Sequence, residues 1–251
     1  MGEDPRYHIK IGCSELGKYV ILPGDRGRVL RIAKYLENAE KKAENREYLT
    51  YTGTLNGVLV SVMSSGMGGP CVEMGVNELL TCGVHTVIRI GTTGALQKNL
   101  HLGDSVIATA AVRKDGASGL YVPYEFPAVG NLETINALVE AAKKVGNPYH
   151  TGIVLSTDAY YARTFAKEQS AQYMALMRKA GVLCVEMEVA TLYTLSAIKG
   201  FRAGAILTIR EEIISDEERI QAGEKYENGL EKSIQITIEA IKMLIEQDRG
   251  R

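Results

Sequence analysis

Short apolar segments rich in β-branched residues alternate with helical patterns along the whole chain. This alternation restricts the possible folds more than any other feature of the sequence. Buried strands are predicted at Tyr19–Leu22, Thr86–Ile90, Ser105–Ala110, Gly152–Leu155, Leu183–Glu186 and Ala203–Ile209. The alternation predicts an α/β fold with a central mixed, largely parallel β-sheet or distorted barrel flanked by helices. Because 251 residues fit one such unit, residues 1–251 are predicted to form a single domain.

Local signals define further elements. Asn56-Gly57 separates the strand patterns Tyr48–Leu55 and Val58–Met63 and suits a type I′ hairpin turn, since both turn residues must take positive φ. A helix is predicted over Arg26–Leu36, directly after a glycine turn. Isoleucines near the end of the sequence recur at helical spacing, which predicts a terminal helix from about Glu217 to Gln247 that packs on the sheet.

Charge and cysteine usage exclude several kinds of protein. The chain has 29 Lys and Arg against 30 Asp and Glu, so its net charge of -1 provides no overall field that would hold a nucleic acid. No stretch is apolar enough for a signal peptide or a membrane span, which predicts a cytoplasmic protein with no membrane partner. Cys13, Cys71, Cys82 and Cys184 form no CxxC pair and have no histidine at metal-ligand spacing. We therefore expect reduced thiols, with neither a disulfide framework nor a structural metal.

Three glycine-rich turns follow apolar strands: Pro23-Gly24-Asp25, Gly66–Pro70 and Gly91–Gly94. At the carboxyl end of a strand such a turn lets backbone N–H groups approach an anion, although each alone is equally well a tight turn. Neither common nucleotide fingerprint fits. Cys71 stands where the dinucleotide pattern needs a third glycine, and Tyr19 stands where a phosphate loop needs Ser or Thr. A Rossmann cofactor site and an ATPase are both disfavoured.

An arginine inside an apolar strand is the most informative charged residue. Arg89 lies within the strand predicted at Thr86–Ile90, where an unpaired guanidinium would cost several kcal/mol to bury. It needs an anion, which is either a ligand or a buried carboxylate such as Glu78 or Glu73. Arg28 and Arg46 follow other segments and would each, taken alone, be solvated surface residues.

Two carboxylates end another apolar segment, Val185-Glu186-Met187-Glu188. Alternation along a strand would place Glu186 and Glu188 on one face. Such a pair can bind a metal, hold a sugar diol or cap the following helix. Metal binding is the weakest of these because no second ligand cluster accompanies the pair.

Together these motifs resemble a known family. The ordered set is Leu22–Asp25, Asn45–Tyr48, Gly66–Pro70, Arg89–Ala95 and Val185–Glu188. In this order the chain resembles the uridine phosphorylase and hexameric purine nucleoside phosphorylase family over nearly its whole length. Val112–Ser118 and Glu125–Val129 look most like the uridine phosphorylase branch.

The resemblance implies roles for individual residues. The implied phosphate ligands are Gly24, Arg28, Arg89 and Thr92 of one subunit and Arg46 of its neighbour. Arginine suits this role because its fork binds phosphate oxygens bidentately. The implied ribose ligands are Met187 and Glu188, with Glu188 accepting from the 2′ and 3′ hydroxyls, and His8 of the adjacent subunit near the 5′ hydroxyl. The catalytic assignments are Arg28, Arg89 and Glu188. A homohexamer built as a trimer of dimers is implied.

The base site departs from the family pattern. Uridine phosphorylases grip uracil with a Gly-Gln-x-Arg segment, and Asp158–Phe165 lacks it. The residues assigned to the base are Thr93, Gly94, Tyr160, Arg210 and Glu211. Tyr160 would stack on the base, and Arg163 or Arg210 would supply a donor. Glu211 either replaces the Asp that acts as an acid in the purine branch or is a solvated charge at a strand end.

The resemblance implies reversible phosphorolysis of a nucleoside, foremost uridine, to free base and ribose 1-phosphate. Inorganic phosphate is then a substrate, and neither a metal nor an organic cofactor is expected. A purine nucleoside or methylthioadenosine phosphorylase of the same family is the alternative. A hydrolase is less favoured because water needs no cluster of arginines. The alternative of another class is a nucleoside-binding protein without turnover.

Overall fold

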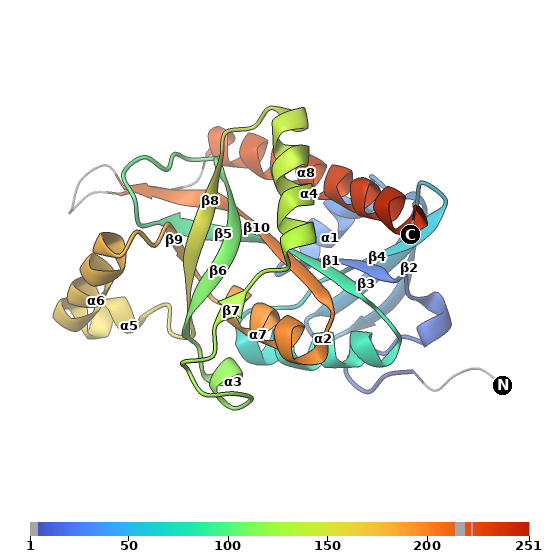
Figure 1. The fold of residues 1–251 in the computed structure, drawn as a ribbon, viewed down its shortest axis with the longest axis horizontal. Coiled ribbons are helices and arrows are strands. Elements are labelled where there is room, and N and C mark those ends of the chain that lie inside the picture. The colour runs from blue at the N-terminus through green and yellow to red at the C-terminus, as the bar shows by residue number, and fades with distance from the viewer. Residues whose placement is uncertain (1–4, 214–218, 222, 251) are drawn as a thin grey trace.

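The computed structural model describes residues 5–213, 219–221 and 223–250. Strands form a mixed sheet whose centre closes into a barrel-like ring (Figure 1). The paired strands of the ring are β5 (Thr86–Ala95), β10 (Arg202–Ile213), β6 (Ser105–Lys114), β8 (Tyr149–Thr157) and β9 (Cys184–Glu186). The circuit closes because β9 pairs with β5 antiparallel, while β10 pairs with β5 parallel. The predicted α/β class is confirmed.

The sheet continues beyond the ring. β1 (Tyr19–Pro23) lies parallel to β5 on one side and to β4 (Val58–Met63) on the other, followed by β3 (Tyr48–Leu55). The hairpin between β3 and β4 is as predicted, since Asn56 and Gly57 have φ of 50° and 71°.

The outermost strand of this side, β2 (Glu37–Asn45), was not predicted because its sequence, ENAEKKAEN, is charged rather than apolar. An edge strand exposed to solvent tolerates such charges, and charged edges also discourage pairing with other chains. β2 pairs with β3 antiparallel, with register shifts along its length.

Helices cover the sheet on both faces. α2 (Gly69–Thr81) and α7 (Val189–Lys199) contact each other below the sheet in Figure 1, and α4 (Leu132–Val145) and α8 (Glu224–Arg249) contact each other above it. Their apolar faces belong to two separate core clusters, one on each side. In α8 the isoleucines at helical spacing are all buried, and each such side chain stabilises the fold by roughly 1.5–3 kcal/mol.

The remaining elements are short or peripheral. They are η1 (Cys13–Glu15), α1 (Arg26–Ala33), α3 (Gly116–Gly119), β7 (Ala128–Val129), α5 (Ala162–Phe165), α6 (Lys167–Lys179) and β11 (Arg219–Gln221). The terminal helix begins later than predicted, at Glu224, because Arg219–Gln221 pairs with β10 as a strand instead. Part of the predicted helical range, residues 214–218 and 222, lies outside the described residues.

One prediction from the cysteines is wrong. Cys13 and Cys82 form a disulfide, whereas Cys71 and Cys184 are free thiols. The two bonded residues are 69 positions apart, so no local spacing could reveal the pair. The fold brings them together because η1 lies against the C-terminal end of α2, where Cys82 is the capping residue. The bond ties the N-terminal segment to that helix.

Two further findings concern the described residues as a whole. None of their helices is long and apolar enough to cross a membrane. They also contain no group of three or more His, Cys, Asp or Glu side chains placed to hold a metal ion.

Candidate active site

Arg89 lies at the centre of the candidate site. Its Nε is 3.3 Å from Glu186 Oε2, and its Nη2 donates to Glu188 Oε2. All three side chains are almost completely buried. The alternative partners Glu78 and Glu73 are excluded, because those carboxylates bind other groups. Arg89 of β5 therefore pairs with both carboxylates of the motif Val185–Glu188.

Glu186 holds this arrangement in place. Its carboxylate accepts from the backbone N–H groups of Glu188 and Val189 at 2.8 to 3.1 Å and from the Ser156 hydroxyl. Glu186 thus fulfils the capping alternative by satisfying the first N–H groups of α7. Burial raises the pKa of the Glu186 carboxyl, and the Arg89 guanidinium opposes that rise.

Glu188 is the N-cap residue of α7 and faces a glycine loop. Its Oε1 accepts the Gly68 N–H at 2.6 Å, and its Oε2 accepts the Met187 N–H at 3.2 Å. Gly68 can present its N–H in this way because its φ is 88°, a value that favours glycine. The loop at Gly66–Pro70 and the Glu188 motif therefore meet in space, 120 residues apart in sequence.

The first glycine turn meets Arg89 from the other side. A Cβ on Gly24 would lie 3.8 Å from Arg89 Nη1 and 3.2 Å from the Gly66 carbonyl oxygen. Asp25 caps α1 by accepting the Gly27 N–H at 3.0 Å, so the positive end of the α1 dipole lies beside Gly24. A side chain larger than hydrogen at residue 24 would narrow the space in front of Arg89.

A second buried guanidinium lies next to the first. Arg28, in α1, is 7% exposed and donates from Nη1 to the Ile90 carbonyl at 3.0 Å. Burial lowers the pKa of Arg28, and the nearby charge of Arg89 lowers it further. Arg28 Nε and Arg89 Nη1 are both buried and have no hydrogen-bond partner among the described residues. Two adjacent cations with unsatisfied donors form a site suited to an anion.

Thr92 and Thr93 continue β5 past Arg89. Thr92 is partly buried and pairs with Thr208 of β10. The Thr93 hydroxyl donates to the Val185 carbonyl at 2.7 Å, which links β5 to β9. The structure therefore gathers Gly24, Arg28, Arg89, Glu188 and the Thr92 strand segment around one place.

His8 and Arg46 lie together but apart from this cluster. The Asn45 side chain donates to the His8 carbonyl at 2.7 Å, and His8 Nδ1 is 2.7 Å from Glu78 Oε1. Arg46 is exposed at a positive φ of 53°, with its carbonyl accepting from Arg26 at 3.1 Å. Within the described part of the chain, neither His8 nor Arg46 contacts Arg89 or Glu188.

Glu211 and Arg210, two of the residues assigned to the base, lie in different places although they are adjacent in sequence. Glu211 pairs with Gly94 across β10 and β5, and its Cβ would lie 3.8 Å from a Cβ on Gly94. Glu211 is 9% exposed, so its interpretation as a solvated strand-end charge is wrong. Arg210 instead places its guanidinium 5.7 Å from the Tyr226 ring. A register shift between Ile209 and Glu211 separates the two adjacent side chains in this way.

Arg163 contacts both Tyr160, which is also assigned to the base, and Glu211. Its Nη2 donates to the Tyr160 hydroxyl at 2.6 Å, its guanidinium lies 4.2 Å from the Tyr160 ring, and its Nη1 is 3.7 Å from Glu211 Oε1. Of the two arginines considered as donors, Arg163 is thus the one beside Glu211.

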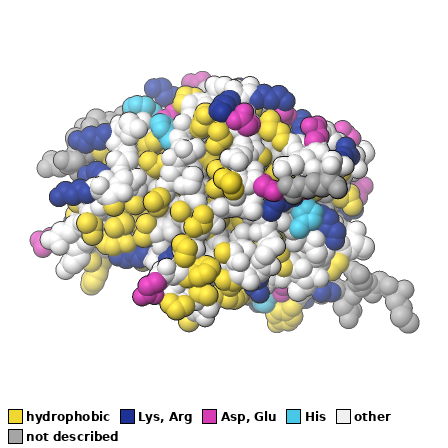
Figure 2. Space-filling view, in the orientation of Figure 1, with side chains coloured by type: hydrophobic (Ala, Val, Ile, Leu, Met, Phe, Trp, Pro, Cys, Tyr) yellow, Lys and Arg dark blue, Asp and Glu magenta, His cyan; other side chains and the backbone are white. Residues whose placement is uncertain are grey.

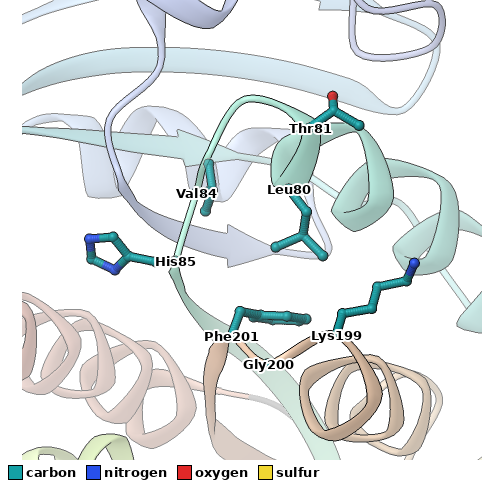
Figure 3. Close-up of a pocket in the computed structure, with 7 residues that line it drawn as sticks. All are labelled: Leu80, Thr81, Val84, His85, Lys199, Gly200 and Phe201. Carbon is teal, nitrogen blue, oxygen red and sulfur yellow. The ribbon is translucent and has the colours of Figure 1, made fainter.

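A surface hollow of about 450 Å³ lies elsewhere, between the C-terminal ends of α2 and α7. Figure 3 shows Leu80, Phe201 and Lys199 around it. None of the residues assigned to phosphate, ribose or base lines this hollow.

Comparison with known proteins agrees with the motifs. The family model described as the Phosphorylase superfamily matches residues 18–242. The chain is similar to a uridine phosphorylase of Thermococcus kodakarensis, with 40% identity over 99% of this chain and 90% of that protein. It is similar to a uridine phosphorylase of Treponema pallidum, with 40% identity over 99% and 97%. A guanosine phosphorylase of Halorubrum lacusprofundi is 35% identical over 94% and 98%.

Proposed function

This chain belongs to the phosphorylase superfamily, and on that premise we propose that it cleaves uridine reversibly with inorganic phosphate, giving uracil and ribose 1-phosphate. One observation carries the proposal. The buried, unsatisfied Arg89 Nη1 lies beside Gly24, the nearby Arg28 has a buried, unsatisfied Nε, and Arg89 also donates to the sugar-binding candidate Glu188. An anion site and a diol acceptor are therefore adjacent, as phosphorolysis of a nucleoside requires.

The chemistry follows from this adjacency. As the bond between C1′ and the base nitrogen breaks, its electron pair leaves with the base and positive charge develops on the ribose. A phosphate dianion bound by Arg28, Arg89 and the backbone at Gly24 stabilises that charge, and one of its oxygens then bonds to C1′. Glu188 accepts from the 2′ and 3′ hydroxyls and fixes the sugar above the phosphate. The departing base anion takes up a proton, which balances the proton that the phosphate dianion gives up as ribose 1-phosphate forms, and no organic cofactor takes part.

We extend the proposal to a homohexamer assembled as a trimer of dimers, in which Arg46 and His8 of one subunit complete the site of its neighbour. Arg46 is exposed, His8 is partly exposed, and neither contacts Arg89 or Glu188 within the described part of one chain, which supports this arrangement. Figure 2 shows hydrophobic side chains along the lower edge of the molecule. Leu120, which follows α3, and Phe165, the last residue of α5, are 90% and 96% exposed. Exposed apolar patches of this kind mark contact surfaces. The cytoplasm is the compartment we propose.

A purine nucleoside is the second candidate substrate. The similarity to a guanosine phosphorylase and the burial of a carboxylate, Glu211, at the base end both favour it. A carboxylate there would accept a hydrogen bond from an N–H of a purine such as guanine.

An assay of the purified protein tests the function. Uridine, inosine, guanosine, adenosine and methylthioadenosine are incubated with and without phosphate, and base and ribose 1-phosphate are quantified. We expect phosphate-dependent cleavage with uridine as the best substrate. Cleavage that does not depend on phosphate would indicate a hydrolase, and nucleoside binding without any product would indicate a binding protein. Either result would refute the proposal.

A further inference from the structure

At the proposed base site, Gly94 leaves space above the sheet because it has no side chain, and the carboxylate of Glu211 lies beside that space. Gly94 lies between Val185 of β9 and Glu211 of β10, and a Cβ added there would approach each no closer than 3.8 Å. Glu211 is only 9% exposed. A flat ring lying over Gly94 would therefore present one edge to Glu211.

A guanidinium stands directly beside that carboxylate. Arg163 Nη1 is 3.7 Å from Glu211 Oε1, which is an ion pair without a close hydrogen bond. The hydrogen bond from Nη2 to Tyr160 and the stacking on its ring orient the guanidinium while leaving Nη1 directed toward Glu211. An acceptor and a donor thus lie side by side, the arrangement that matches a base edge carrying a donor next to an acceptor.

We infer that Glu211 and Arg163 together select bases with a lactam edge, an N–H next to a C=O, and reject bases with an amidine edge. This inference rests on the proposed function and specifies the substrate class of the same site.

The pairing follows from donor and acceptor order. In uracil and in the 6-oxopurines the ring N–H donates to the Glu211 carboxylate, and the neighbouring carbonyl accepts from Arg163. Cytosine and adenine carry the reverse order, a ring nitrogen lone pair next to an amino group. The lone pair would then face the carboxylate and the amino group would face the guanidinium, so both contacts become repulsive and neither protein group forms a hydrogen bond with the base. The pair reads the edge of the base rather than the size of its ring.

The test compares substrates within each ring size. We measure kcat/KM with saturating phosphate for uridine against cytidine, and for inosine against adenosine. A site that hydrogen-bonds the edge of its substrate discriminates strongly against an analogue with the wrong edge, so we expect the lactam member of each pair to be favoured by at least about 100-fold. 3-Methyluridine, which lacks the N–H but keeps both carbonyls, is expected to be rejected as well. Titration calorimetry with uracil and cytosine in the presence of phosphate gives a readout that needs no turnover.

Two variants locate the discrimination. Glu211→Gln keeps the shape but can donate as well as accept, and Arg163→Gln loses the cation. We expect each to lower the ratio of uridine to cytidine at least ~10-fold, because the mismatched contacts lose a full charge. Glu212→Gln is the matched control, since this neighbouring carboxylate binds His101 and the Leu102 N–H instead, and its ratio should equal that of the wild type.

The outcomes are distinct. Phosphate-dependent cleavage with equal use of lactam and amidine nucleosides would overturn the inference and leave the proposed function standing. The same holds if both variants lose activity toward every nucleoside in proportion. Absence of phosphorolysis together with equal binding of uracil and cytosine would overturn both.

Discussion

Glu188, the N-cap residue of α7, accepts a hydrogen bond from Arg89 in β5 through its buried carboxylate. The same guanidinium keeps Nη1 unsatisfied beside Gly24. The group proposed to hold the sugar and the group proposed to hold the phosphate are therefore one connected unit. Disturbing either is expected to affect the binding of both substrates.

Replacing Arg89 by Lys should abolish efficient use of phosphate. Lysine keeps one positive charge but loses the fork that reaches Glu186, Glu188 and the anion together. We expect kcat/KM for phosphate to fall at least about 100-fold. Steady-state kinetics with varied phosphate measure this. Arg31→Lys is the control, since Arg31 binds Glu227 and Glu231 outside the site. An unchanged phosphate dependence in Arg89→Lys would refute the assignment.

Glu188→Gln should reveal its role through the sugar. The wild type is expected to prefer uridine over 2′-deoxyuridine because the carboxylate accepts from the 2′ hydroxyl. The amide is a weaker acceptor, so the preference should shrink by roughly 10-fold, in line with loss of one charged hydrogen bond. Kinetics on the two nucleosides at fixed phosphate give the ratio. A ratio that stays constant would place the carboxylate away from the ribose.

Mixed oligomers test whether Arg46 acts across an interface. Differently tagged Arg46→Ala and Arg89→Lys subunits are coexpressed and the doubly tagged species is purified. If Arg46 serves its neighbour, each mixed dimer contains one intact site and one doubly defective site. Since about half of the dimers in randomly assembled hexamers are mixed, the purified species should regain about a quarter of wild-type activity. If Arg46 serves its own subunit, every site in the mixture is defective. Activity no higher than that of the parents would therefore contradict the proposed donation.

The disulfide should contribute to stability. It closes a separation of 69 residues between Cys13 and Cys82, and a native disulfide typically contributes about 2–4 kcal/mol. We expect reducing agent to lower the unfolding temperature of the wild type but not of Cys82→Ser, which already lacks the bond. Cys71→Ser should remain as sensitive to reductant as the wild type, because Cys71 is a free thiol. Equal unfolding temperatures with and without reductant in the wild type would contradict this contribution.

Asp248 should stabilise the fold in a pH-dependent manner. Its carboxylate accepts from Arg202 at 2.5 and 2.8 Å and from the Tyr19 hydroxyl, which ties α8 to β10 and β1. The hydrogen bonds from Arg202, ahead of the one from Tyr19, lower the pKa of Asp248 to about 2. A depressed carboxyl pKa contributes stability above the unfolded value of 3.8 and loses it as the pH falls toward 2.

The variant Asp248→Asn measures that contribution. We expect it to cost about 1 kcal/mol at pH 7, a modest value because the side chain is partly exposed, and to cost progressively less below pH 4. Urea unfolding across this pH range gives the difference. A cost that is constant from pH 7 to pH 2 would show that the charge of Asp248 is not the cause.

Much of the fold could be predicted because its strands are buried and apolar. The hairpin at Asn56-Gly57 was predictable from turn chemistry alone, and Arg89 was conspicuous because a cation in an apolar strand needs a partner. β2 was not predictable, since an exposed edge strand carries no apolar pattern. The Cys13–Cys82 bond also depends on tertiary contact alone.

The partners of Arg89 were beyond the reach of sequence for the same reason. Glu186 and Glu188 lie 97 and 99 residues away, and Glu78 and Glu73 were nearer along the chain. The choice between Arg163 and Arg210 as base donor depended on a strand irregularity that no residue type announces. The residue assignments to phosphate, ribose and base stay predictions until the variants are measured.

The irregularity in β10 has a wider consequence. In an unbroken ladder Arg210 would have stood opposite Gly94, yet one extra residue delivers Glu211 there. With the base over Gly94, as we propose, the sign of the electrostatic potential at the base depends on strand length as much as on side-chain identity. A lineage descended from such a protein can invert its preference between bases through a single insertion or deletion, with every neighbouring amino acid left as it was.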